Sequence, residues 1–119
     1  MGEINLDKEI AQMLQEYTDD VLDRIAKEGD KIAKAGAAEL RRTSPVDTGE
    51  YAAGWTKRRI DGTEYIYNAK KPTLTHLLEF GHLKRGGGRV AGIPHIKPVE
   101  EKVIEDFEKA VIEAIERGG

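Results

Sequence analysis

The chain has no cysteine among its 119 residues, and it is poor in serine and aromatic side chains. Without cysteine there is no disulfide, no Cys-ligated zinc and no thiol nucleophile. Ser44, the single serine, precedes a proline and lacks the Gly-x-Ser-x-Gly setting of a serine nucleophile. These absences indicate a protein made in a reducing cytoplasm and remove the commonest nucleophiles.

Long apolar runs are also missing. Charged residues interrupt the first 14 positions, so we expect no signal peptide, and no stretch approaches the length of a membrane helix. With 39% hydrophobic and 34% charged residues, the composition is that of a folded soluble protein. The length suits one domain, residues 1–119, with a single modest core.

Charge is distributed unevenly along the chain. Residues 1–40 hold 5 Lys and Arg against 10 Asp and Glu, and residues 98–119 hold 3 against 7. Residues 41–97 reverse this balance, with 11 against 5. A basic centre between acidic flanks predicts contacts with anionic partners or with acidic parts of another copy.

Residues 1–42 are predicted to contain a long amphipathic helix that can project from the body. Apolar residues recur at helical spacing from Leu6 to Leu40, and Asn5 is the expected N-cap. Gly29 and Gly36 are places where it can bend, so one helix or two remain open.

A basic hairpin and loop module is expected over residues 43–97. Thr43-Ser44-Pro45 ends the helix and Asp47-Thr48-Gly49 forms a turn. The Asp61-Gly62 pair predicts a β-hairpin of strands 55–60 and 63–68. A short helix from Pro72 through Phe80 should end at Gly81.

After that short helix, the glycine-rich segment Lys84–Arg89 reads as a mobile loop, and residues 90–93 can add a short strand. The C-terminal helix is expected over residues 98–119, with Pro98 at its first position, Glu100 and Glu101 in its first turn, and its apolar stripe packed on the sheet. The predicted fold class is α+β, with a small antiparallel sheet built on the hairpin.

Signals for catalysis or metal binding are weak. His76, Glu79 and His82 would approach one another only if the short helix continued past Gly81, and Glu79 is expected to be a polar surface or interface group. The triple glycine lacks the Gly-Lys-Ser/Thr ending of a phosphate-binding loop. We therefore predict no enzyme activity and no catalytic, cofactor or metal site.

Nucleic-acid binding is the alternative that the sequence supports best. Six central cations can contact phosphates, and Trp55, Tyr65 and Tyr67 can stack on bases. The acidic helices oppose attraction to DNA, so the same cations are predicted to contact a protein partner, including another copy. These candidate contact residues are Lys57, Arg58, Arg59, Lys84, Arg85 and Arg89.

Three segments together carry a family resemblance: Thr43–Tyr51 (TSPVDTGEY), Leu77–Gly81 (LLEFG) and Ile93–Pro98 (IPHIKP). Their order is similar to that of the tail-completion or head-to-tail joining proteins of long-tailed bacteriophages and prophages. Asp-Thr-Gly also occurs in aspartic proteases, which would need a second copy or a homodimer and an all-β fold. The departures from the family pattern are His95-Ile96, where an aromatic residue more often follows the proline, and the glycine-rich loop.

The resemblance implies a structural virion protein of the tail or neck, assembled in the cytoplasm of a host bacterium. It implies a homo-oligomeric ring that contacts neck or adaptor proteins and tail-tube proteins, without catalysis, cofactor or membrane. DNA contact stays open and is not favoured. The resemblance assigns structural roles to Pro45, Asp47, Thr48, Gly49, Glu79, Phe80, Gly81, Pro94 and Pro98.

Overall fold

Helix α2, Asp19–Thr43, is the longest element of the computed structural model, which describes residues 3–5, 17–46 and 49–118. The Thr18 side chain caps its start by accepting a hydrogen bond from the Val21 N–H. Its end follows from Pro45, because proline disfavours helical geometry in the residue before it. The helix buries one stripe: Val21, Ile25, Gly29, Ala33, Gly36, Ala37 and Leu40.

The long N-terminal helix is confirmed, but its predicted start is wrong. Asn5 is the last residue of strand β1, Glu3–Asn5, rather than an N-cap, and residues 6–16 lie outside the described residues. Strand pairing is the cause, because the fully buried Ile4 lies opposite Ile66 in the sheet. Helix α2 continues unbroken through Gly29 and Gly36.

The main sheet has the strand order β1-β3-β2 and is antiparallel throughout. Strands β2, Trp55–Ile60, and β3, Thr63–Asn68, form the predicted hairpin. The turn residues Asp61 and Gly62 have φ angles of 50° and 80°, as a two-residue hairpin with right-handed strand twist requires. One face of β3 turns toward the helices and buries Glu64, Ile66 and Asn68.

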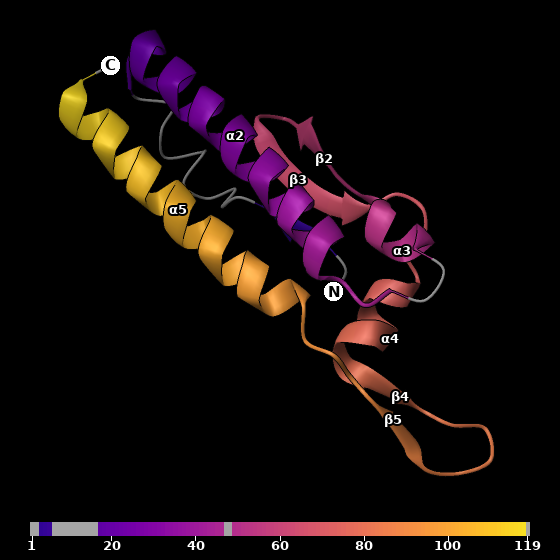
Figure 1. Cartoon of the computed structure of the whole chain (residues 1–119). Helices are drawn as coiled ribbons and strands as arrows, with labels where there is room; N and C mark the ends of the chain where they lie inside the picture. The colour runs from indigo at the N-terminus through magenta and orange to yellow at the C-terminus, as the bar shows by residue number, and fades with distance from the viewer. Residues whose placement is uncertain (1–2, 6–16, 47–48, 119) are drawn as a thin grey trace.

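Helix α5, Ile96–Arg117, lies antiparallel beside α2 (Figure 1). It starts two residues earlier than predicted, so Pro98 is its third residue rather than its first. Glu100 and Glu101 consequently lie beyond the first turn, in which they were expected. It packs chiefly along α2, and its Val103 side chain lies next to Gly36, as does the Ile66 side chain of the sheet. The α+β class with a helix-covered antiparallel sheet is confirmed.

Shorter elements complete the chain. Helix α3, Glu50–Ala53, precedes β2, and helix α4, Leu74–Phe80, follows β3. Strands β4, Gly81–Leu83, and β5, Arg89–Ala91, pair antiparallel as a second hairpin that projects from the end of the molecule (Figure 1). Within residues 3–5, 17–46 and 49–118, no helix has the length and apolar character needed to cross a membrane.

The helix crossing generates a testable prediction about two glycines. A Cβ atom at Gly36 would stand 2.7 Å from Ile66 Cδ1 and 2.8 Å from Val103 Cγ1, both in side chains that are buried. Gly36→Ala should therefore lower the free energy of unfolding by about 1 kcal/mol, since overpacking outweighs the gain in helix propensity. Urea denaturation measures the change.

Gly29 of the same helix is the matched control. A Cβ atom there would be 3.4 Å from the nearest atom, Cε1 of Phe107, which is an acceptable contact. Gly29→Ala should raise the free energy of unfolding by about 0.5–1 kcal/mol through helix propensity alone. Equal stabilisation by both substitutions would contradict the tight crossing at Gly36.

Candidate functional site: a buried junction and the exposed arm it positions

Glu79, the penultimate residue of α4, caps the first turn of α5. Its carboxylate accepts backbone N–H hydrogen bonds from His95 at 2.7 Å, Ile96 at 2.8 Å and Lys97 at 3.1 Å. These donors have no partners within the helix, and the helix dipole favours a negative charge at this place. The side chain is only 5% exposed, so the prediction of a surface or interface group is wrong.

The environment of Glu79 keeps it ionised although it is buried. Burial by itself raises its pKa, but the three backbone hydrogen bonds lower the pKa below its ordinary value. The cap is consequently a charge-assisted interaction at neutral pH, which is stronger than a cap made by a neutral side chain.

His95 extends this network to α3. Its Nδ1 lies 2.7 Å from the Ile93 carbonyl, which can only accept, so we assign the proton to this nitrogen. The other ring nitrogen, Nε2, is 2.6 Å from the Tyr51 hydroxyl and accepts a hydrogen bond from it. Burial, with the charge of Glu79, raises the pKa of Tyr51 well above its ordinary value, so this hydroxyl remains a donor.

Trp55 connects the same network to the end of α2. Its indole Nε1 donates to Ser44 Oγ at 2.8 Å, and its carbonyl accepts from Arg41 at 2.7 Å. The rings of Tyr51, Trp55 and His95 pack edge to face, with centroids 5.6–6.5 Å apart. We call this cluster the junction; its members are Ser44, Tyr51, Trp55, Glu79 and His95.

The junction brings together the three segments that carry the family resemblance. Ser44 and Tyr51 belong to the first, Glu79 to the second and His95 to the third. Gly49 adopts a left-handed φ of 89° at the start of α3, whereas Asp47 and Thr48 lie outside the described residues. Of the other motif residues, Phe80, Pro94 and Pro98 are exposed, and Pro45 is half-buried.

Two glycines close the base of the β4–β5 hairpin. A Cβ atom at Gly81 would lie 2.3 Å from the Val90 carbonyl oxygen, and one at Gly92 would lie 2.4 Å from the Glu79 carbonyl oxygen. Gly81 also has a φ of 81°, which favours glycine at this helix end, as predicted. Backbone therefore packs on backbone, next to the junction, where the hairpin leaves the body.

Beyond that base, every residue from His82 to Ala91 is exposed, and we call this segment the arm. Leu83 is 76% exposed on it, and Phe80, at its base, is 52% exposed. Its tip is ordered as a turn in which the Lys84 N–H donates to the Gly88 carbonyl at 2.9 Å. The arm thus presents apolar side chains together with Lys84, Arg85 and Arg89.

The six candidate contact cations do not form one surface. Lys57 and Arg59 lie on the helix-facing side of β2, and each forms an ion pair with the buried Glu64 at 2.9 Å. Lys57 also pairs with Asp30, and hydrogen bonds from Lys57 and then Lys34 lower the pKa of Asp30 to about 2. Arg58 lies on the opposite face of the sheet.

Arg58 stands over the ring of Tyr67 at 5.3 Å. Trp55, the expected stacking residue, is only 1% exposed and serves the junction instead. Lys84, Arg85 and Arg89 alone gather on one projecting element, the arm.

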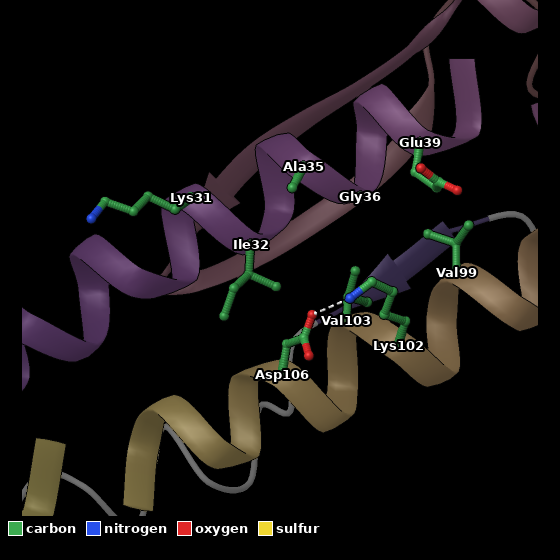
Figure 2. Close-up of a pocket in the computed structure, with 9 residues that line it drawn as sticks. All are labelled: Lys31, Ile32, Ala35, Gly36, Glu39, Val99, Lys102, Val103 and Asp106. Carbon is green, nitrogen blue, oxygen red and sulfur yellow. Dashed lines mark hydrogen bonds and ion pairs between the residues drawn. The ribbon is translucent and has the colours of Figure 1, made fainter. Parts of the chain in front are cut away.

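A groove of 320 Å³ runs between α2 and α5. Figure 2 shows Ile32, Val99 and Val103 on its inner side and the Lys102–Asp106 ion pair, 3.0 Å long, at its rim. Lys31 and Glu39 at the rim are paired with Glu28 and Arg42. An apolar floor with neutralised rim charges suits an apolar side chain better than a charged substrate.

The histidines and the acidic residues near them do not form a metal site in the described part of the chain. No group of three or more His, Asp or Glu side chains is placed there to hold a metal ion. His76 packs on Phe80 with ring centroids 5.0 Å apart, and Glu79 is occupied by backbone N–H groups.

Comparison with known protein families identifies the chain. The model of the HK97-gp10-like family, described as "Bacteriophage HK97-gp10, putative tail-component", matches residues 8–81, more than half of the sequence. The chain belongs to this family. No curated protein and no solved structure matches it.

Membership confirms the predicted phage resemblance and makes the chain a tail component of the virion. The matched region ends at Gly81, so the arm and α5 of this HK97-gp10-like protein lie beyond it.

One local feature of the sequence indicates that α5 is capped from elsewhere in the chain. Pro94-His95 precedes α5 without the Ser, Thr, Asp or Asn that usually caps a helix, so an acceptor from elsewhere in the chain was required. That acceptor is Glu79, and the backbone N–H groups that it caps lie 16 to 18 residues later in the sequence. This separation is beyond the reach of a local capping pattern.

Glu79→Gln tests the cap directly. The amide retains one acceptor oxygen, but it loses the charge and directs an NH₂ group at backbone donors. We expect the free energy of unfolding of this HK97-gp10-like protein to fall by about 2–3 kcal/mol at pH 7, as measured by urea denaturation. Glu108→Gln, at an exposed position of α5, is the control and should change stability by less than about 0.5 kcal/mol.

The stability difference between wild type and Glu79→Gln is also expected to depend on pH. The pKa of Glu79 is lower in the folded state than its unfolded value near 4.5, so its stabilising contribution is complete above that pH. The contribution is lost as the pH falls through the lower, folded-state pKa. The stability difference between wild type and Glu79→Gln should therefore be constant from neutral pH down to about 5 and shrink in more acidic solution; a difference that grows on acidification would oppose the assignment.

Proposed function

We propose that this tail component is a non-enzymatic completion or head-to-tail joining subunit, which forms a ring and contacts neck or adaptor proteins and tail-tube proteins. We also infer that it acts as one domain of 119 residues, because one buried cluster includes residues of β1, α2, α3, both strands of the β2–β3 hairpin and α5. Family membership supports the tail role.

The observation that carries the joining role is the shape of the subunit. Its principal extents are 59 × 22 × 21 Å, and the arm forms one end of this elongated body (Figure 1). A small hairpin is marginal by itself in water, and here it exposes apolar side chains along a projecting segment. Such a segment suits a subunit whose partners cover it in an assembly.

The sheet offers further contact sites. Strands β1 and β2 each have one edge that pairs with no other described strand, and such edges can add strands from a neighbour. A ring needs contacts of the heterologous kind, in which two different surfaces of identical subunits meet. The projecting arm and the open sheet edges are different surfaces that can make such a heterologous contact.

Deleting the gene from the phage or prophage that encodes it tests the proposal. Electron microscopy of the lysate should show DNA-filled heads and tails that remain separate, because the connecting layer is missing. Supplying the wild-type chain from a plasmid should restore joined, infectious particles.

The Gly29→Ala chain serves as a matched control in that complementation, since the substitution leaves all exposed surfaces intact. Joined and infectious particles in the complete absence of the chain would overturn the joining role. Salt-dependent binding of the purified chain to mixed-sequence DNA would instead favour the nucleic-acid alternative.

A further inference from the structure

The arm carries cations that nothing in the described chain neutralises. Lys84 and Arg85 form no ion pair with another described residue. The Arg89 guanidinium donates a hydrogen bond to the Phe80 carbonyl at 2.6 Å. No acidic residue occurs between Phe80 and Glu100. The arm is therefore a positively charged end with exposed leucine and valine beside the charge.

The opposite end of the molecule is acidic. Figure 1 shows the start of α2 and the end of α5 side by side there, far from the arm. Their carboxylates form what we call the acidic pole: Asp19, Asp20, Asp23, Glu113 and Glu116. Of these, only Glu113 forms an ion pair with a described residue, Arg117, at 2.6 Å.

A groove of 290 Å³ lies within the acidic pole, between α2 and α5. Ala110 and Ala114 give it a wall of small side chains, and Glu28 and Glu113 stand at its sides. Glu28 is paired with Lys31, Glu113 is paired with Arg117, and Arg24 interacts with another group, so the groove itself carries balanced charge. Asp20 and Asp23 line the hollow next to it and form no ion pair with a described residue. The groove can therefore receive an apolar side chain while cations next to that side chain meet the two aspartates.

We propose that the arm of one subunit docks on the acidic pole of a second copy. Lys84 and Arg85 meet the carboxylates of Asp20 and Asp23, and Leu83 enters the neighbouring groove. The contact is head to tail, so it uses two different surfaces. An open chain of subunits therefore has a free arm at one end and a free acidic pole at the other. Repetition closes into a ring where the rotation between copies allows it.

This inference rests on the proposed ring assembly and specifies the surfaces that form it. Charge complementarity selects the partner: Lys57 and Arg59 of β2 are already paired with Glu64, whereas the cations of the arm form no ion pair with a described residue. Opposite charges at the two ends also align subunits before contact, which favours one orientation of encounter.

Sedimentation velocity of the purified full chain, over a range of concentrations, tests the contact. Wild type should form discrete oligomers that dissociate as ionic strength rises from about 0.01 M to about 1 M, where the screening length falls from about 30 Å to about 3 Å. Lys84→Glu with Arg85→Glu should weaken association at least about tenfold at low salt. Asp20→Lys with Asp23→Lys should do the same.

Combining the four substitutions in one chain exchanges the charges of the two ends. That chain should associate within about threefold of wild type, because each reversed arm again faces an oppositely charged pole. An equimolar mixture of the two double variants should also form oligomers that neither forms alone. Both results distinguish a broken contact from a damaged fold, as circular dichroism should confirm for each variant.

Lys70→Glu with Lys97→Glu is the matched control, because these two exposed lysines lie outside the arm and the acidic pole and form no ion pair with another described residue. This chain should associate like wild type. A wild-type chain that stays monomeric at all concentrations would overturn the proposal. Unchanged association of the double variants, or failure of the charge exchange to restore it, would do so as well.

Phage complementation separates this inference from the proposed function. If the gene is needed for joining, the arm-reversed chain should fail to restore joined particles, and the chain with exchanged charges should restore them. Full complementation by the arm-reversed chain would reject the head-to-tail contact and leave the joining role standing. Joined particles without any chain would reject the joining role itself.

Discussion

The carboxylate of Glu79 connects the end of α4 with the start of α5, two elements that the arm separates in the sequence. It satisfies three backbone donors at the start of α5, and through His95 it reaches Tyr51 and the aromatic cluster beside α2. The direction of α5 and the departure of the arm from α4 are both set within this one cluster. For the joining role proposed above this rigidity is an advantage, because a loosely held arm would lose conformational entropy at every contact it makes.

Locally encoded elements were readable from the sequence, and elements that depend on distant partners were not. Asp61-Gly62 dictates its turn through its own backbone preferences, so the β2–β3 hairpin could be placed to the residue. Asn5 resembled a helix cap because a capping pattern is local, whereas its actual place in β1 depends on Ile4 lying opposite Ile66, some 60 positions later in the chain.

The same distinction explains the site. The signs and positions of the charges can be read from the sequence but their partners cannot, so six cations were predicted to form one contact surface. The fold places Lys57 and Arg59 against the buried Glu64 and leaves only Lys84, Arg85 and Arg89 on the arm. The burial of Glu79 could not be predicted for a related reason: a buried carboxylate is stable only beside donors, and these donors lie 16 to 18 residues further along the chain, beyond the arm.

The glycine tip of the arm has a practical consequence. A Cβ atom at Gly86 would meet no other atom within 4 Å, and the space beside Gly87 and Gly88 is equally open, while the base of the arm is fixed by the close passage of Gly81 and Gly92. Extra sequence at the tip can therefore extend into solvent without straining the body, as insertions at exposed loop tips generally can. A short epitope grafted there would be displayed by a free subunit and hidden wherever that tip is covered, making it a reporter of assembly.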